Sequence, residues 1–308
     1  MTDARRIAAY GVLTDDAGRV LLTRSSERSD VAGTWYLPGG GVEHGEPPAD
    51  AVVREFAEET GLTVAVAGLR GVTADVLSIP ARGQRLHTDR VLYDVRRLDG
   101  ELRDEPFGTT DLARFVSLAD AARLPLMPFV AETLGLPSTP PRVRPDLPPG
   151  EPAPEPPPAR PTRGQRFAAY AYATDPAGRV LLSHISAGYP GAGRWHLPGG
   201  GTDHGERPAA GLVREVYEET GQRGTVGDLL DVSSHRDPKA LGPEGYALDW
   251  HGVRVLYRVT VREPSVPTVT ELDGSTDAAA WFTADELADL PVTDVVELAL
   301  RWARSSDR

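Results

Sequence analysis

The stretch GGGVEHGEPPADAVVREFAEETG, residues 39–61, places three glutamates and one arginine within six positions near its end. A closely similar stretch, GGGTDHGERPAAGLVREVYEETG, occupies residues 199–221. Like charges at helical spacing repel one another by about 0.2–0.5 kcal/mol per pair. An acidic helix that occurs twice therefore indicates that something offsets the repulsion, and bound metal would do so.

Local signals set the limits of this helix. Pro48 and Pro208 suit the first helical turn, where no backbone N–H is needed, and Gly61 and Gly221 suit the position that ends a helix. We therefore expect a helix over 48–60 and over 208–220. One face is expected to pack on a sheet, with Ala49, Val52, Val53, Phe56, Ala57 and Thr60 in the first copy and Ala209, Leu212, Val213, Val216, Tyr217 and Thr220 in the second.

Three carboxylates are expected on the opposite helix face: Glu55, Glu58 and Glu59, repeated as Glu215, Glu218 and Glu219. A set of ligands made only of oxygen suits Mg²⁺ or Mn²⁺ and not zinc, which prefers His and Cys. The alternative is a solvated acidic face. The glycine-rich loop that precedes the helix at the same spacing both times favours metal binding, because glycine lets carbonyl groups approach a ligand closely.

The duplication extends over most of the chain. Residues 7–22 match 167–182, and residues 33–61 match 193–221, both at an offset of 160. The proline-rich segment 137–165 lies between the copies and holds twelve of the 28 prolines. We expect a semi-rigid polyproline spacer there, or alternatively a docking site for a proline-binding partner. The expected domains are therefore 1–136 and 166–308, joined by the linker 137–165.

Each copy is expected to be rich in β-strands. The segments RIAAYGVLTD and RVLLTRS predict a hairpin that turns at Asp16–Gly18, and the runs LTVAVAGLRGV and RVLYDVRRL predict further strands. A short helix is expected at LADAARLP and at ADELADLP near the end of each copy. The second copy holds a longer loop around 235–250, which we expect to shape a pocket.

Composition excludes several classes of protein. The 308 residues carry a net charge of −12, which argues against a nonspecific nucleic-acid binder. Cysteine is absent, so disulfides and thiol chemistry are excluded. No apolar run reaches the length of a membrane span, and the N-terminus has no signal-peptide pattern. We therefore expect a cytoplasmic protein with no membrane or nucleic-acid partner; its oligomeric state stays open.

The loop and helix together resemble the signature of the Nudix hydrolase family, and the resemblance covers both copies. It implies an α/β (α+β) fold of two tandem Nudix α/β/α sandwich domains with mixed sheets. It also implies hydrolysis of nucleoside diphosphates linked to another group, with Mg²⁺ or Mn²⁺ as cofactor. One position departs from the signature: its final apolar residue is Leu62 in the first copy but Gln222 in the second, which puts local packing in doubt.

The resemblance also implies roles for individual residues. Glu55, Glu58, Glu59 and the Gly39 carbonyl would bind metal, and Glu55 would act as the base or position it. Arg54 would orient the glutamates, and Glu46 would brace the loop. The corresponding set in the second copy is Glu215, Glu218, Glu219, Gly199, Arg214 and Glu206. Family members often use one more distant acid, which the alignment of GTTD with GSTD places at Glu105 and Glu271.

Substrate contacts are less defined. Candidates are His44 and His204 in the loop, and His87, Arg90, His251 and Arg254 in the repeated pattern H-x-x-R-V-L-Y. Trp35 and Trp195 are expected to be core aromatics and not platforms for a base. The closest pattern is the MutT-like group acting on nucleoside triphosphates; prenyl diphosphates, nucleotide sugars and a regulatory module with one inactive copy stay open as alternatives. We expect one reaction type with unequal substrate preferences in the two copies.

Overall fold

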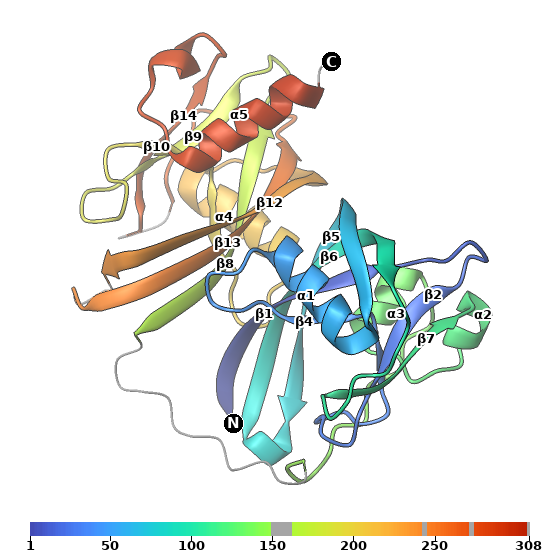
Figure 1. Ribbon diagram of the computed structural model, residues 1–308. Helices are drawn as coiled ribbons and strands as arrows, with labels where there is room; N and C mark the ends of the chain where they lie inside the picture. Colours follow the sequence, from blue (N-terminus) through green and yellow to red (C-terminus); the bar gives the residue numbers. More distant parts are fainter. Residues whose placement is uncertain (149–161, 242–244, 271–273, 307–308) are drawn as a thin grey trace. The chain divides into compact units, whose positions relative to one another are not determined.

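The computed structural model describes residues 1–148, 162–241, 245–270 and 274–306 (Figure 1). The chain divides into two compact units, Met1–Gln165 with Ser234–His251 and Arg166–Ser233 with Gly252–Arg308. Each unit contains one copy of the acidic helix. Within the described ranges, no helix is long and apolar enough to cross a membrane.

The first copy alternates long strands with short helices. Its strands are β1 (Thr2–Val12), β2 (Val20–Ser25), β3 (Trp35–Tyr36), β4 (Gly39–Gly41), β5 (Leu62–Ile79), β6 (Gln84–Gly100) and β7 (Thr110–Val116). Its α-helices are α1 (Pro48–Thr60), α2 (Leu118–Ala121) and α3 (Pro128–Leu134), and a 3₁₀ turn spans Pro80–Arg82. The expected strands, the acidic helix and the short helix near the end are thus confirmed.

The main sheet of this copy is mixed. Its strand order is β4-β1-β6-β5; β1 runs parallel to β6, whereas β5 and β4 are antiparallel to their neighbours. The expected turn after β1 is present, because the N–H of Gly18 donates to the Asp15 carbonyl at 2.9 Å. However, β2 leaves β1 soon after the turn and joins β3 and β7 in a second, smaller sheet. The predicted hairpin is therefore a corner between two sheets.

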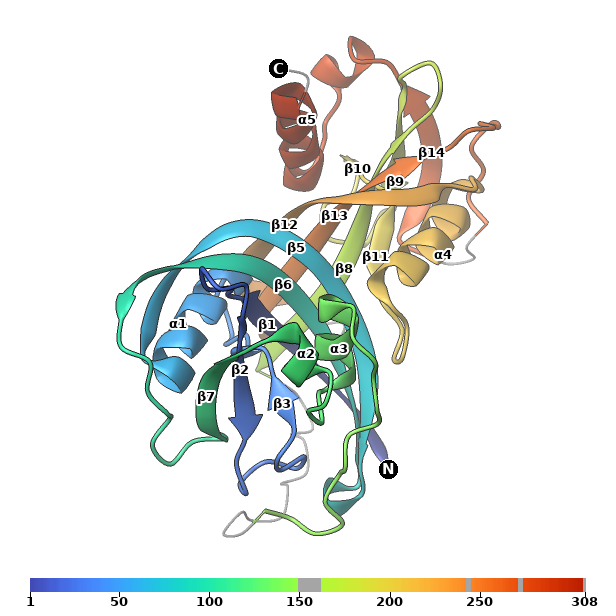
Figure 2. The same ribbon diagram turned by 90° about the vertical axis from the view of Figure 1, so that its right-hand side faces the viewer.

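Helices cover both faces of the main sheet, as neighbouring residues of β1 show. A Cβ at Gly11 would lie 2.6 Å from Cε2 of Phe56, so α1 packs directly on the backbone at this point. The preceding Tyr10 packs on the opposite face against Phe129 of α3, with 4.6 Å between ring centroids. Successive side chains of a strand point to opposite faces, so α1 and α3 enclose the sheet in an α/β/α sandwich (Figure 2).

The second copy repeats this order. Its strands are β8 (Arg163–Thr174), β9 (Val180–Ile185), β10 (Trp195–His196), β11 (Gly199–Gly201), β12 (Thr225–Leu241), β13 (Ala247–Thr260) and β14 (Thr276–Phe282), and its α-helices are α4 (Pro208–Thr220) and α5 (Asp294–Ser306). The helical segment expected at ADELADLP is a 3₁₀ turn, Glu286–Asp289. Here the strands join in one sheet with the path β10-β9-β8-β13-β12, and β11 and β14 pair at its sides.

Two local expectations need correction. The segment expected as a long loop around 235–250 is largely strand, since β12 runs to Leu241 and β13 begins at Ala247; residues 242–244 lie outside the described residues. The proline-rich segment is also less uniform than expected. Val143 packs against the core of the first copy, the N–H of Arg144 donates to the Asp30 carbonyl at 2.8 Å, and β8 already begins at Arg163.

The acidic helix has the predicted limits but a different buried stripe. Pro48, Ala51, Val52, Phe56, Glu59 and Thr60 are the buried residues of α1, whereas Ala57 is exposed. In α4, Val213 and Tyr217 are exposed at 46% and 43%. The stripe is rotated because the helix turns Glu59 and Glu219 inward toward the glycine loop. The prediction that all three glutamates lie opposite the packed face was therefore wrong for these two.

Candidate active site

The glycine loop and the acidic helix meet through one buried carboxylate. Glu59 is 7% exposed, and its Oε2 accepts the Gly39 N–H at 3.0 Å; Glu219 and Gly199 repeat this bond at 3.0 Å. Only glycine fits at the loop position, because φ of Gly39 is 143° and a Cβ there would lie 2.2 Å from the Ala9 carbonyl oxygen. The loop is thus held close to both the helix and β1.

Arg54 is the positive group that compensates the acidic helix. Its Nε and Nη2 donate to Glu46 at 2.9 and 3.0 Å, and its Nη1 donates to Glu55 at 2.9 Å and to Glu58 at 3.3 Å. Nη2 also donates to the Gly41 carbonyl at 2.9 Å. Five donors in a rigid fork allow one guanidinium to serve three carboxylates and the loop at once. The side chain therefore joins the helix to both ends of the loop.

Arg214 makes the same contacts in the second copy. It donates to both oxygens of Glu206 at 3.1 and 2.9 Å, to Glu215 at 3.0 Å and to Glu218 at 2.9 Å. Glu206 in turn accepts the N–H of Asp203 at 2.9 Å, as Glu46 accepts that of Glu43 at 2.9 Å. The geometry of the acidic helix is therefore duplicated as closely as its sequence.

Burial disfavours the charged form of the carboxylates nearest the glycine loop. Burial raises the pKa of Glu59 well above its usual range, and the neighbouring Glu55 and Glu105 raise it further. Burial raises the pKa of Glu219 to about 7 and also raises the pKa of Glu55. Clustered carboxylates with raised pKa values would be stabilised by a nearby cation. The charge distribution is therefore that of a site suited to one.

Donor chemistry also fits a hard divalent cation, since Glu55, Glu59 and residues Gly39–Gly41 line one cavity. In the described part of the chain, no three acidic or histidine side chains already stand together as a metal cluster. Arg54 and Arg214 account for this, because each holds the outer glutamates of its copy. Metal binding would require these carboxylates to turn from the guanidinium toward the cation.

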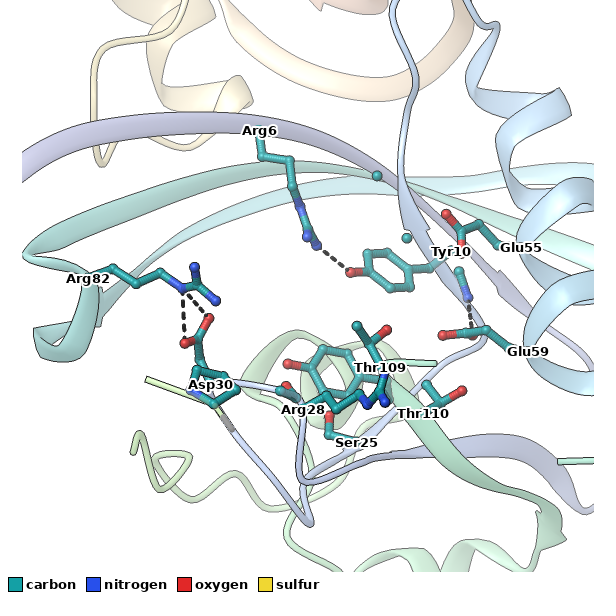
Figure 3. A pocket seen from close by; sticks show the side chains of 16 residues that line it. Arg6, Tyr10, Ser25, Arg28, Asp30, Glu55, Glu59, Arg82, Thr109 and Thr110 are labelled. Atoms are coloured by element: carbon teal, nitrogen blue, oxygen red, sulfur yellow. Dashed lines mark hydrogen bonds and ion pairs between the residues drawn. The ribbon is translucent and has the colours of Figure 1, made fainter. Parts of the chain in front are cut away.

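The cavity of the first copy measures about 650 Å³. Its lining comes from β1, β2, the loop 26–34, β3, the glycine loop, α1, the 3₁₀ turn, the start of β7 and the proline-rich segment. The lining residues are Arg6, Tyr10, Ser25, Arg28, Ser29, Asp30, Tyr36, Gly39, Gly40, Gly41, Glu55, Glu59, Arg82, Thr109, Thr110 and Pro148. Figure 3 shows Glu55 and Glu59 on one side and the Arg82–Asp30 pair on the other. The cavity thus runs from an acidic end to an end that contains arginine.

The distant acid lies in the loop before β7. Glu105 accepts the Thr110 N–H at 3.1 Å and its hydroxyl at 2.7 Å, and its charge acts on Glu59. In the second copy, the equivalent threonine, Thr276, instead donates its hydroxyl to Glu219 at 2.9 Å. Glu271 lies outside the described residues. The place of Glu105 is therefore compatible with the role that the alignment assigns to it.

The substrate candidates from the sequence lie elsewhere. His44, His87 and Arg90 are not among the described residues that line the cavity. His87 is fully buried beside Asp89, with Nε2 3.2 Å from Oδ1, and Arg90 pairs with Asp75 at 2.9 Å and stacks on Phe129.

The second-copy candidates show similar structural partners. His251 is fully buried, and Arg254 donates to both oxygens of Asp294 at 3.0 and 2.8 Å. His204 lies in the loop between β11 and α4. Trp35 is 4% exposed and belongs to the core, as expected. The burial of His251 and the ion pair of Arg254 are therefore those of structural positions.

Two cavity residues that were not among the predicted candidates lie in a repeated sequence pattern. Arg6 and Tyr10 belong to the pattern R-x-A-A-Y, which recurs as Arg166 and Tyr170 at the same offset of 160. The Nη2 of Arg6 donates to the Tyr10 hydroxyl at 3.1 Å. Asp30 and Arg82 had no such signal, since only the folded chain brings them to one cavity with Arg28.

Comparison with known proteins identifies the family of the chain. The NUDIX domain family matches residues 4–134 and 164–302. An ADP-ribose pyrophosphatase of Methanocaldococcus jannaschii is 34% identical over 128 residues, which cover 42% of this chain and 69% of that protein. Diphosphoinositol polyphosphate phosphohydrolase 3-alpha of Homo sapiens is 42% identical over 76 residues, which cover 24% of this chain and 44% of that protein.

A solved structure is also similar in sequence. The MutT NUDIX hydrolase from Burkholderia pseudomallei is 30% identical, with a TM-score of 0.35, and the match covers 45% of this chain and 97% of that one. The chain belongs to the Nudix hydrolase family and contains two domains of that family. It is accordingly an enzyme that hydrolyses diphosphate bonds.

Proposed function

We propose that each copy uses Mg²⁺ or Mn²⁺ to hydrolyse a diphosphate bond in a nucleoside diphosphate-linked substrate, of which nucleoside triphosphates are one class. One observation carries this proposal and occurs in both copies. A buried glutamate, Glu59 in the first copy and Glu219 in the second, accepts a hydrogen bond from the glycine loop. The neighbouring glutamates of the same helix are hydrogen-bonded to one arginine. A nucleotide sugar or a prenyl diphosphate is the alternative substrate, and a regulatory module with one inactive copy is the alternative function.

Roles follow from position. Glu55, Glu58 and Glu59 would hold the cation with the Gly39 carbonyl, and Glu105 would complete the set from its loop. When bound, the cation supplies charge neutralisation at the diphosphate and lowers the pKa of water. Glu55 would accept the proton of the attacking water, because its carboxylate faces the cavity beside Gly40. One P–O bond forms to that water, and the bridging P–O bond breaks.

The proposal is tested with the full chain and a panel of nucleotides, dinucleotides and prenyl diphosphates, by measuring the release of phosphate or pyrophosphate. A chelator should abolish hydrolysis, and Mg²⁺ or Mn²⁺ should restore it. Full activity after exhaustive removal of metal would overturn the mechanism.

Substitutions separate the two copies. Glu59→Gln and Glu219→Gln each remove one ligand charge with little change in volume, and each should lower the turnover of its own copy by about 10²-fold or more. The double variant should be inactive, and Glu132→Gln, an exposed change on α3, serves as the control. If either single variant abolishes activity on every substrate, the other copy is not catalytic.

A further inference from the structure

The cavity of the first copy is lined by arginines as well as by the carboxylates of Asp30, Glu55 and Glu59. Its lining includes three guanidinium groups, Arg6, Arg28 and Arg82. Arg82 donates through Nε to both oxygens of Asp30, at 3.0 and 2.9 Å. In the described residues, neither Arg6 nor Arg28 has a hydrogen bond or ion pair with a carboxylate. The charge of Glu55 acts on Arg6 across the cavity, whereas Arg28 has no acidic partner among the described residues.

Their described partners are neutral. Arg6 donates Nη2 to the Tyr10 hydroxyl at 3.1 Å, and Arg28 donates Nη1 to the Phe107 carbonyl at 2.9 Å. Each guanidinium has five N–H donors, so most of them stay available to a ligand. Figure 3 shows Arg6 entering the cavity from one side and Arg28 from the opposite side, between the Glu55–Glu59 end and the Arg82–Asp30 end.

The second copy keeps only one of these arginines. Arg166 occupies the position of Arg6, and the loop after β9 repeats the loop after β2: Ser186 N–H donates to the Ser275 carbonyl at 2.8 Å, as Ser26 N–H does to Thr109. At the constant offset of 160, however, Gly188 replaces Arg28, and Pro190 replaces Asp30. The combination of Arg6 with a second arginine at position 28 is thus a feature of the first copy alone.

We propose that Arg28, together with Arg6, binds a phosphate group of the substrate other than those at the metal-binding end, and that Arg28 sets the specificity of the first copy. Guanidinium forks match phosphate geometry and form charge-assisted hydrogen bonds with it. The first copy then prefers substrates with an additional phosphate, whereas the second copy, which has glycine at this position, does not. This proposal rests on the proposed function, which places the cation and the reacting diphosphate at the Glu55–Glu59 end of the cavity.

A binding experiment tests the arginines without requiring catalysis. Inorganic tripolyphosphate and inorganic diphosphate are titrated calorimetrically into the metal-free full chain in the presence of a chelator. Arg28→Gln keeps a donor for the Phe107 carbonyl but removes the charge, so it should weaken tripolyphosphate binding by about tenfold and change diphosphate binding less. Arg123→Gln, an equal loss of charge at a side chain that is 80% exposed on the same unit, should change neither.

A kinetic experiment tests specificity in the first copy alone. In the Glu219→Gln protein with Mg²⁺, di(adenosine-5′) pentaphosphate should be hydrolysed with a kcat/KM about tenfold above that of di(adenosine-5′) diphosphate. Arg28→Gln should remove this preference by raising the KM for the pentaphosphate. In the Glu59→Gln protein, where the second copy acts, Arg28→Gln should have no effect.

The outcomes separate the two proposals. If Arg28→Gln lowers kcat equally for both substrates and leaves tripolyphosphate binding unchanged, Arg28 only supports the loop that carries Phe107, and the inference is wrong. It is also overturned if tripolyphosphate binds as well to Arg28→Gln as to the parent. If no substrate is hydrolysed but tripolyphosphate binding depends on Arg28, the inference stands and the proposed function fails.

Discussion

At the scale of single residues, one guanidinium in each copy makes the acidic helix possible. Arg54 and Arg214 each contact three glutamates, so the repulsion expected from the sequence is offset within the protein even without metal. Gln222, the departure from the family signature, is compensated in a similar way. Its buried amide donates to Ser265 Oγ at 2.9 Å and accepts the Ser265 N–H at 3.0 Å. The polar residue thus ties the chain after β13 to the end of α4.

Tyr36 of the first copy is replaced by His196 in the second, and this histidine predicts how stability depends on pH. Burial, together with the nearby charge of Arg254, lowers the pKa of His196 from 6.5 to about 4. Between pH 6.5 and pH 4, His196 is therefore protonated in the unfolded chain but largely neutral in the folded chain. The free energy of unfolding consequently falls as the pH drops from about 6.5 toward 4. His196→Tyr, the residue of the first copy, should reduce the loss of unfolding free energy between pH 7 and pH 5 by about 2 kcal/mol.

Thermal or urea unfolding at the two pH values measures this effect. His235→Tyr makes the same substitution at an exposed histidine of the second copy and serves as the control. An unchanged acid sensitivity in the His196→Tyr protein would show that His196 is not the group responsible.

At the scale of the element, the limits of α1 depend on its ends and its orientation depends on the site. Gly61 ends the helix with φ at 71°, and its N–H donates to the Ala57 carbonyl at 3.2 Å. A Cβ at this glycine would lie 2.6 Å from Cγ of Arg103 and 2.8 Å from the Glu101 carbonyl oxygen. Gly18 has a similar φ of 73° but no heavy atom within 4 Å of such a Cβ. Substitution of Gly18 therefore introduces backbone strain alone, whereas substitution of Gly61 adds steric overlap.

Gly18→Ala should accordingly destabilise the protein by about 1 kcal/mol, the cost of a left-handed conformation alone. Gly61→Ala should cost more, at least about 2 kcal/mol, because the Arg103 segment must also move. Chemical unfolding of both variants provides the comparison. Equal losses would mean that the segment after β6 yields freely and does not hold the end of α1.

At the scale of the whole molecule, the proline-rich segment belongs partly to the first copy. Arg144 Nη1 lies 2.8 Å from Glu27 Oε2, Val143 joins the core, and Pro148 lines the cavity. A cut near residue 150 leaves these contacts intact, and each half is then expected to unfold cooperatively by itself. A first fragment that ends at residue 136 should be less stable, because it lacks Val143 and Arg144.

Calorimetry of the purified halves tests this independence. The segment Ser234–His251 groups with the first unit, so its separation is the most demanding part of the experiment. Halves that are insoluble or unfold without cooperativity would show that the copies share a core or an obligate interface.

The sequence by itself determined the features that depend on local or periodic patterns. The duplication, the limits of α1 and α4, the mixed α/β fold implied by the family resemblance and the clustering of the glutamates were all predictable. Proline at a helix start and glycine at its end act over a few residues, so no distant contact overrides them. The repeat itself showed that both copies were built in the same way.

Only the tertiary structure decided which side of the helix Glu59 occupies and which residues face the cavity. Glu59 points inward because it accepts a hydrogen bond from the Gly39 N–H. This partner lies twenty residues earlier on another element, so the local sequence of the helix does not reveal it. Arg6, Arg28 and Arg82 meet in one cavity through the parallel pairing of β1 with β6 and the corner between β1 and β2. Such contacts depend on strand register over more than seventy residues, which the periodicity of a single segment does not encode.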